Sequence, residues 1–386
     1  MNNPRIFVLI AVLLGGMGQG VVAPKLPELL HESGALFLSS GISATLMYFA
    51  IFISTFKYGT LADRGKVHLL LGFGLLFYAG SLLALGLAPN QGVVFAVRFV
   101  EGLAMSAVFV AADFVLGRLS AASERAQWLS YYGVALSIGL LLGPTLALVS
   151  GKLGATVGLR DELASSPLFP LGIVAAFSVA LCAPGFLTRV APIENDGAGT
   201  PPLHRGALLT GVVYGFMEAA LVAVFPVLAV KEFHVRPEYC LLTVILSAAV
   251  SSVVWGYLAD KRGAAPIATL LVGGLAVGCA AFALGHATLG PSPTAFGGCI
   301  FFGILAGGLY PVGFAWLLEG LPESAYGYAS GGFARAYGLG SLSGPLAVGA
   351  AAQYFGSTGL FAAMLSASGL GLLGIFYAPR NRRLAA

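Results

Sequence analysis

Long apolar stretches alternate with short polar segments along the whole chain. Each apolar stretch runs for about 20 residues with few charges, the length that an α-helix needs to cross the hydrocarbon core of a membrane. The pattern predicts twelve such helices. We expect the first six at residues 6–27, 40–61, 68–88, 92–117, 128–151 and 167–187. We expect the second six at residues 207–230, 240–258, 265–286, 293–318, 327–352 and 357–378.

One long polar segment separates the two sets of helices. It reads TRVAPIENDGAGTPPLHRG and covers residues 188–206. Its proline and glycine content is typical of a linker, so we expect two six-helix domains at residues 1–187 and 207–386. At the N-terminus, Arg5 precedes an apolar run that is too long for a signal peptide. We therefore expect an uncleaved first helix.

Composition supports the same class. Hydrophobic residues make up 58% of the chain and charged residues only 9%, which is too little charge to cover a soluble protein. The 54 glycines favour close packing between transmembrane helices. We predict an all-α integral membrane protein that is a monomer in the lipid bilayer and binds no cofactor or metal. The cysteines have no paired spacing and are interpreted as small apolar side chains: Cys182, Cys240, Cys279 and Cys299.

The loop charges indicate an orientation. If the N-terminus is cytoplasmic, most Lys and Arg residues of the loops fall on the cytoplasmic side, as positively charged loops do in membrane proteins. Both termini and the 188–206 linker are then inside the cell, and we expect a prokaryotic inner membrane. This bias also explains the net charge of +4, so no nucleic-acid partner is implied.

The two halves of the chain repeat one another. Gly59–Asp63 reads GTLAD and returns as GYLAD at Gly256–Asp260, 197 residues later. GLLLGP at Gly139–Pro144 returns as GSLSGP at Gly340–Pro345. The repeat predicts two pseudo-symmetric six-helix bundles, and duplicated bundles of this kind hold their substrate near the membrane midplane where the halves meet.

These motifs resemble those of the major facilitator superfamily, whose loop between helices 2 and 3 reads G-x-L-A-D-R-x-G-R-K. Residues 59–64 match it, but one residue is missing before Gly65 and the basic pair is reduced to Lys66. The second copy keeps Asp260 and Gly263 and lacks the basic residues that should follow. The resemblance covers essentially the whole chain and implies a twelve-helix transporter.

Two further motifs carry the resemblance. RFVEG at Arg98–Gly102 is similar to the family's R-x-x-q-G, with Glu101 in place of glutamine. Helices 5 and 11 carry the glycine pattern of proton-coupled exporters, complete only in helix 11, and the resemblance implies a role in helix packing. The residues concerned are Gly139, Gly143, Pro144, Gly331, Gly340, Gly344 and Pro345.

The charged loop motif has two interpretations. The resemblance implies a clasp between the halves, which holds the outward-facing state and uses Asp63, Arg64, Lys66 and Asp260. A carboxylate at the end of helix 2 can accept a hydrogen bond from a neighbouring helix N-terminus and complement its dipole. The alternative is that these are ordinary cytoplasmic loop charges.

Ionisable residues inside the predicted helices are candidates for proton coupling, because burying them in a bilayer is costly. Arg98 and Glu101 are three residues apart, so they share a helix face and can neutralise one another; a purely structural ion pair is the alternative. Asp113 belongs near the cytoplasmic end of the same helix, where it either takes part in coupling or only marks the interface.

Glu218 is the sharpest candidate for the proton carrier. It lies near the middle of the helix at 207–230, and its counterpart in the first repeat is the neutral Gln19. One half therefore offers a titratable group where the other does not. The alternative is a structural carboxyl paired with a neighbour such as Arg335.

Polar and aromatic residues of the predicted cavity helices suit an amphiphilic or apolar organic solute, although each aromatic ring is also explained by packing. The candidates for the substrate cavity are Gln19, Tyr131, Tyr132, Tyr214, Phe216, Tyr310, Trp316 and Arg335.

Enzyme motifs and a phosphate-binding G-x-x-x-x-G-K-[ST] loop are absent from the sequence, which leaves an ion gradient as the energy source. We expect a secondary transporter that exports small amphiphilic molecules or drugs in exchange for protons. The alternatives are a proton-coupled uptake symporter for a metabolite and a non-transporting membrane receptor on the same fold.

Overall fold

The computed structural model describes residues 3–30, 35–119, 122–156, 158–160, 163, 166–190, 202–319, 321 and 326–377. Every regular element in these ranges is helical. The chain divides into two compact units, which are described separately. Unit 1 comprises Met1–Gly34 and Leu46–Asp196, and unit 2 comprises Ala35–Thr45 and Gly197–Ala386.

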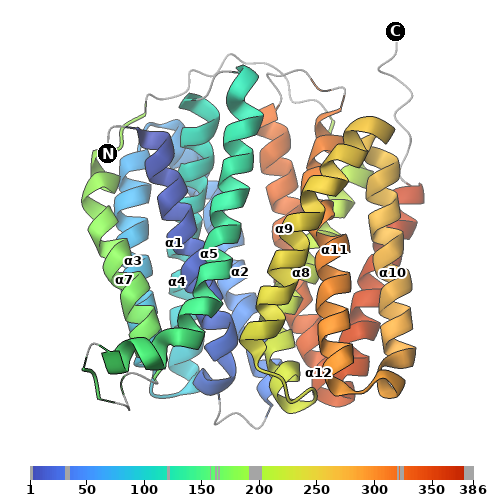
Figure 1. Cartoon of the computed structure of the whole chain (residues 1–386). Coiled ribbons are helices and arrows are strands. Elements are labelled where there is room, and N and C mark those ends of the chain that lie inside the picture. The colour runs from blue at the N-terminus through green and yellow to red at the C-terminus, as the bar shows by residue number, and fades with distance from the viewer. Residues whose placement is uncertain are drawn as a thin grey trace. The chain divides into compact units, whose positions relative to one another are not determined.

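Unit 1 is a bundle in which α1 packs along α5, and α3 lies between α4 and α7 (Figure 1). Most of α2 also belongs to this unit. Its helices are α1 (Pro4–Leu29), α2 (Leu36–Asp63), α3 (Val67–Gly86), α4 (Gln91–Leu119), α5 (Ala122–Thr156) and α7 (Leu168–Leu187).

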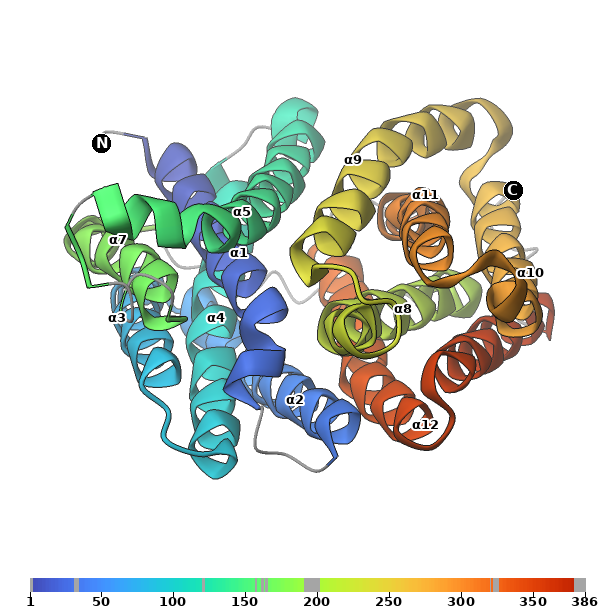
Figure 2. The same cartoon turned by 60° about the horizontal axis from the view of Figure 1, so that its bottom comes forward.

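Unit 2 repeats this scheme, because α8 packs along α12 as α1 does along α5. Figure 2 shows α11 flanked by α8, α9 and α10, all of which it contacts. Its helices are α8 (Arg205–Lys231), α9 (Pro237–Arg262), α10 (Ala264–Leu289), α11 (Pro291–Leu318) and α12 (Tyr326–Tyr377).

Within the described residues, eleven helices are long and apolar enough to cross a membrane. The last of them, α12, is two helices joined at Gly356, whose backbone is not helical (φ 56°, ψ −139°). A carboxylate oxygen of Glu232, at the end of α8, accepts a hydrogen bond from the backbone N–H of Ser357 at 3.0 Å. This contact caps the second helix of α12 from a neighbouring element. The expected helices at 327–352 and 357–378 thus correspond to the two parts of α12.

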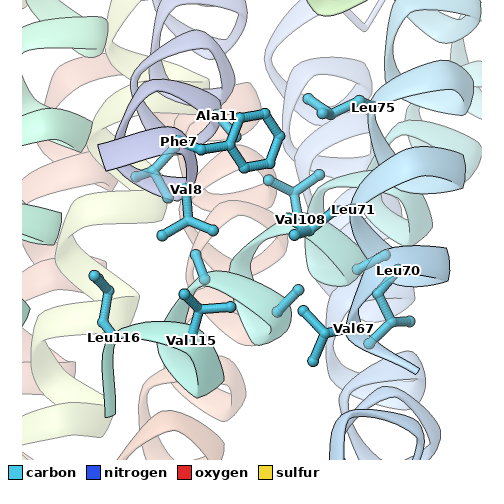
Figure 3. Close-up of a cluster of buried hydrophobic side chains, with 14 of the residues drawn as sticks. Phe7, Val8, Ala11, Val67, Leu70, Leu71, Leu75, Val108, Val115 and Leu116 are labelled. Atoms are coloured by element: carbon cyan, nitrogen blue, oxygen red, sulfur yellow. The ribbon is translucent and has the colours of Figure 1, made fainter. Parts of the chain in front are cut away.

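Unit 1 contains a large buried cluster of apolar side chains. Phe7 and Val8 of α1 point toward Leu71 of α3 and Val108 of α4 (Figure 3). All four side chains are at most 2% exposed. Because lipid is as apolar as these side chains, tight packing rather than hydrophobic burial holds the helices together.

Glycines allow α1 and α5 to approach backbone to backbone. A Cβ added at Gly139 would overlap the carbonyl oxygen of Leu13, and one at Gly143 would overlap that of Met17. Pro144 follows directly and lies inside α5. Any side chain larger than hydrogen at these two positions would push the helices apart.

The same relation holds in unit 2. A Cβ at Gly340 would overlap the carbonyl oxygen of Val212 of α8, and one at Gly344 would overlap that of Phe216. Pro345 lies inside α12, as Pro144 lies inside α5. The two helix pairs therefore share one packing device.

Gly331 does not take part in this packing, which corrects the expectation from the glycine pattern. A Cβ at this position would meet nothing within 4 Å, and the residue is exposed. The sequence pattern matches there, but no helix among the described residues approaches that point of α12.

Each copy of the charged motif ends its helix with a left-handed glycine. Gly65 (φ 75°) follows α2, and the N–H of Lys66 bonds back to the carbonyl oxygen of Leu61 at 3.0 Å. Gly263 (φ 87°) follows α9, and its N–H bonds to the carbonyl oxygen of Ala259 at 2.8 Å. Glycine adopts this conformation without steric cost, so it terminates both helices.

Candidate functional site

Unit 1 contains a buried polar cluster built from three helices. The side-chain amide of Gln19 on α1 donates to Oε1 of Glu101 on α4 at 3.1 Å, and it also contacts the sulfur of Met47 on α2 at 3.1 Å. Nη1 of Arg98 donates to Oε2 of Glu101 at 2.6 Å. Both oxygens of the carboxylate are therefore bonded.

Burial of this ion pair is nearly complete. The side chain of Glu101 is 0% exposed and that of Arg98 is 5% exposed. Nε of Arg98 is buried and has no hydrogen-bond partner among the described residues. Separating two such charges would leave each one unpaired in an apolar medium, which costs several kcal/mol. The expected pairing of Arg98 with Glu101 is present in the structure.

Unit 2 holds its carboxylate at a different place. Glu218 is the central residue of α8, and Oε2 accepts a hydrogen bond from the hydroxyl of Tyr337 on α12 at 2.9 Å. Both side chains are half-buried. The close approach of α8 and α12 at Gly340 brings the two residues within reach of each other.

The donor Tyr337 belongs to a cluster of three tyrosine rings. The ring centroid of Tyr214 lies 5.6 Å from that of Tyr310 and 5.7 Å from that of Tyr337, and Tyr310 and Tyr337 are 6.1 Å apart. Phe333 packs edge-on against Tyr310 at 5.2 Å. These residues come from α8, α11 and α12, so three helices contribute to one aromatic cluster beside Glu218.

Gln19 and Glu218 occupy equivalent positions of the two repeats but have different hydrogen-bond partners. Gln19 bonds to a carboxylate that is already paired with Arg98, whereas Glu218 bonds to a neutral hydroxyl. A carboxylate held by a hydroxyl exchanges a proton more readily than one held by a guanidinium, because the fixed positive charge favours the ionised form. The carboxylate of unit 1 is thus paired with a cation, and that of unit 2 accepts a hydrogen bond from a neutral hydroxyl.

Other candidate cavity residues lie elsewhere. Trp316 is two residues from the end of α11, and its ring packs against His204 at 4.7 Å, at the start of α8. Arg335 is exposed on α12. Phe216 is half-buried on α8, and its backbone faces Gly344. Trp316 also packs against the buried apolar cluster that includes Phe333, the residue in contact with Tyr310.

In unit 1 the remaining candidates are also dispersed. Tyr131 packs edge-on against Trp128 at 5.5 Å and is 41% exposed. Tyr132 packs against Phe109 at 6.0 Å. Asp113 is exposed on the last part of α4.

The charged motif residues lie at helix ends. Arg64, Lys66 and Asp260 are exposed, while the side chain of Asp63 lies outside the part of the structure that is described. The clasp stays a prediction.

Sequence reasoning missed several partners. Tyr337 was absent from the candidates, and its counterpart in the first repeat is the apolar Leu136, so the repeat gives no polar signal there. Cys240 of α9 and Cys299 of α11, interpreted as small apolar side chains, lie beside one another. No spacing in the sequence indicates that contact.

A second missed cluster lies at the start of α8. Nδ1 of His204 accepts a hydrogen bond from the backbone N–H of Ala207 at 3.3 Å and so caps the helix. Oε1 of Glu319 accepts one from the N–H of Ala264, the first residue of α10, at 3.2 Å. Burial lowers the pKa of His204 from its usual value, and the negative charge of Glu319 opposes that shift.

Comparison with known proteins gives a consistent picture. The sequence profile described as Major Facilitator Superfamily matches residues 8–292 and 207–386. The uncharacterized MFS-type transporter YfkF of Bacillus subtilis (strain 168) is 25% identical over 384 residues, covering 94% of this chain and 92% of that protein.

Two further proteins are similar to the chain. The tetracycline resistance protein, class B, of Escherichia coli is 26% identical over 156 residues, which is 40% of this chain and 39% of that protein. The crystal structure of a bacterial homolog of the human lysosomal transporter Spinster, inward-facing and occupied, superimposes with a TM-score of 0.74 at 15% identity. That match covers 97% of this chain and 96% of the solved chain, and it shows the fold.

Proposed function

This chain belongs to the major facilitator superfamily, and we propose that it is a secondary active transporter that exports small amphiphilic organic molecules in exchange for protons. The observation that carries the proposal is the position of Glu218 in the middle of a membrane-spanning helix, bonded to a neutral hydroxyl. An ionisable residue at that depth is costly, and such residues usually serve a pathway.

The proposed cycle uses one proton-binding group, Glu218, which takes up and releases one proton per cycle. When Glu218 is open to the outer side, its carboxylate takes a proton from water. When the same group opens to the cytoplasm, it releases the proton and substrate binds in the cavity beside it. We assign Arg98 and Glu101 the accompanying role of a fixed, paired charge that stabilises unit 1 through both states, and we propose Asp113 as a secondary proton site.

Export rather than uptake is favoured by one comparison. The Escherichia coli relative is named for tetracycline resistance, and resistance suits a protein that removes a compound from the cell. Its similarity to this chain spans well under half of either protein, so the direction of transport is a proposal.

The experiment is transport by purified protein in vesicles with an imposed pH gradient. Glu218→Gln mimics a permanently protonated carboxyl, so we expect gradient-driven transport to collapse. Glu28→Gln is the matched control, because Glu28 is half-exposed, pairs with the neighbouring Lys25 and lies in unit 1. Retention of gradient-driven transport in Glu218→Gln would remove Glu218 from the mechanism.

We further propose that both termini and the linker lie in the cytoplasm, on the basis of the positive charges of the loops. Tags at either end or within residues 188–206 should then react with impermeant reagents only after the cells are opened. Labelling of these tags in intact cells would reverse the orientation.

A further inference from the structure

Two cysteines of unit 2 lie side by side in the contact between α9 and α11. Cys240 is in the first turn of α9, and Cys299 is about two turns into α11. Their side chains lie beside one another, and both are free and fully buried. A disulfide between two such thiols requires only an acceptor for two electrons and two protons. The pair is therefore a candidate for covalent modification.

The packing of α9 against α11 explains why these two residues meet. A Cβ added at Gly303 of α11 would lie 2.6 Å from the carbonyl oxygen of Val244 of α9, and one at Gly307 would lie 2.6 Å from that of Ala248. A step of four residues along α11 thus corresponds to four residues along α9, so the two helices run in the same direction in a fixed register. One turn before the first of these contacts, the same register pairs the two cysteines.

Hydrogen bonds hold this register beyond the glycines. Nε1 of Trp255 on α9 donates to the carbonyl oxygen of Ile304 on α11 at 2.7 Å, and the hydroxyl of Ser251 donates to that of Gly303 at 3.3 Å. Neither helix can turn and separate the thiols without breaking these bonds. A disulfide requires Cα atoms about 4.4 to 6.8 Å apart, a separation that two helices reach where small residues let their backbones approach.

The position of the pair along the helices suits oxidation. With both termini in the cytoplasm, as proposed above, α9 and α11 begin at the outer side of the membrane, and both cysteines are nearer to that end of their helices. Disulfides form and persist outside the cytoplasm, whereas cytoplasmic thiols are kept reduced.

We propose that Cys240 and Cys299 are a site of disulfide formation that joins α9 to α11 and stabilises unit 2. The oxidant is a disulfide donor of the outer compartment. One cysteine thiolate attacks the donor disulfide and releases the first donor thiol, and the other cysteine then attacks the mixed disulfide and releases the second. The two electrons and two protons lost by the cysteines leave with the two donor thiols. Because both sulfurs are covered in the folded chain, the exchange takes place while α9 and α11 assemble.

The thiol state of the protein in cells tests this proposal. The full chain is inserted into the inner membrane of a bacterial host, thiols are trapped by acid, and the protein is unfolded, alkylated and digested for mass spectrometry. We expect the peptides of Cys240 and Cys299 to be joined, and to separate after treatment with dithiothreitol. If both are alkylated without prior reduction, the proposal is overturned, whichever orientation the terminal tags report. The result does not depend on transport, so the exporter and the disulfide stand or fall separately.

Serine variants test the pairing. Cys240→Ser and Cys299→Ser should each abolish the joined peptide. Cys182→Ser on α7 and Cys279→Ser on α10 are the matched controls, because each removes another buried thiol, and both should retain it. A joined peptide that contains Cys279 in place of either partner overturns the pairing.

The bond should also be measurable as stability. It closes a segment of chain that contains all of α10, so it restricts the unfolded chain and should raise the unfolding temperature. Wild type reconstituted in nanodiscs with and without prior reduction should differ, with the oxidised form unfolding at the higher temperature. Cys240→Ser should show no such difference. Equal unfolding temperatures of oxidised and reduced wild type would overturn the stabilising role of the bond.

Discussion

Tyr337 and Glu218 are 119 residues apart in the chain, yet the tyrosine hydroxyl donates to the carboxylate at 2.9 Å. A hydrogen bond donated to a carboxylate favours its ionised form. Tyr337→Phe keeps the ring and removes this donor. We therefore expect the pH at which proton-driven transport is half-maximal to differ from that of wild type. Initial rates in vesicles across a series of pH values measure it, with Tyr257→Phe as the control. An unchanged midpoint would show that the hydroxyl has no influence on the protonation of Glu218.

Removing only one partner of the buried ion pair in unit 1 should lower the stability of the folded protein. Glu101→Gln leaves the charge of Arg98 unpaired among apolar helices, and we expect a loss of about 3 to 5 kcal/mol in the free energy of unfolding. The double variant Arg98→Met, Glu101→Gln removes both charges and should recover most of that loss. Thermal unfolding in nanodiscs compares them. If the double variant is no more stable than Glu101→Gln, an unpaired charge is not the cause.

The proposed clasp predicts a shift between conformations. If Asp63 stabilises the outward-facing state, Asp63→Asn should move the population inward and slow transport while the protein still folds. The reactivity of cysteines engineered on each side of the membrane reports the shift, and Asp260→Asn tests the second copy in the same way. Wild-type reactivity together with full transport would leave only the interpretation as loop charges.

His204 predicts a pH dependence of stability with a definite sign. Because burial lowers the pKa of His204 in the folded protein, the unfolded chain binds the proton more readily. The stabilisation is complete above about pH 6.5, the ordinary value for histidine, and is lost as the pH falls through the lower folded value. Protonation also turns Nδ1 from an acceptor into a donor and removes the cap on Ala207.

Two variants test the cap. His204→Asn keeps an acceptor at the N-cap without a titrating group, so the unfolding temperature should lose this dependence between pH 5 and 7. His204→Ala loses the acceptor as well and should be less stable by about 1 kcal/mol at neutral pH. A pH profile that is the same in His204→Asn and wild type would assign the dependence to other groups.

The glycines of α12 offer a matched comparison. Gly340→Ala places a methyl group against the backbone of α8 at Val212, and we expect a loss of about 1 to 3 kcal/mol in the free energy of unfolding. Gly331→Ala meets nothing within 4 Å and should be neutral or slightly stabilising, since alanine favours helix. Equal effects at the two positions would contradict the packing described for α8 and α12.

The sequence predicts contacts within a helix better than contacts between helices. Apolar runs long enough to cross a bilayer located the helices, and a spacing of three residues predicted the pair of Arg98 and Glu101. The partner of Glu218 could not be found in this way, because no periodicity along one helix sets its register against another. Trp316 was grouped with the cavity by residue type alone, although its place at the end of α11 puts it beside His204.

The backbone contact between α8 and α12 has a mechanical consequence. With Gly340 and Gly344 against α8, the two helices cannot slide or rotate past one another without a clash of main chains. Glu218 and Tyr337 are fixed to these two helices, so the donor and the acceptor travel together as one stiff body whenever unit 2 moves. Deformation of unit 2 would therefore change the affinity of Glu218 for a proton very little. In the proposed cycle, the side of the membrane that the site faces would change while the geometry of this hydrogen bond stayed the same.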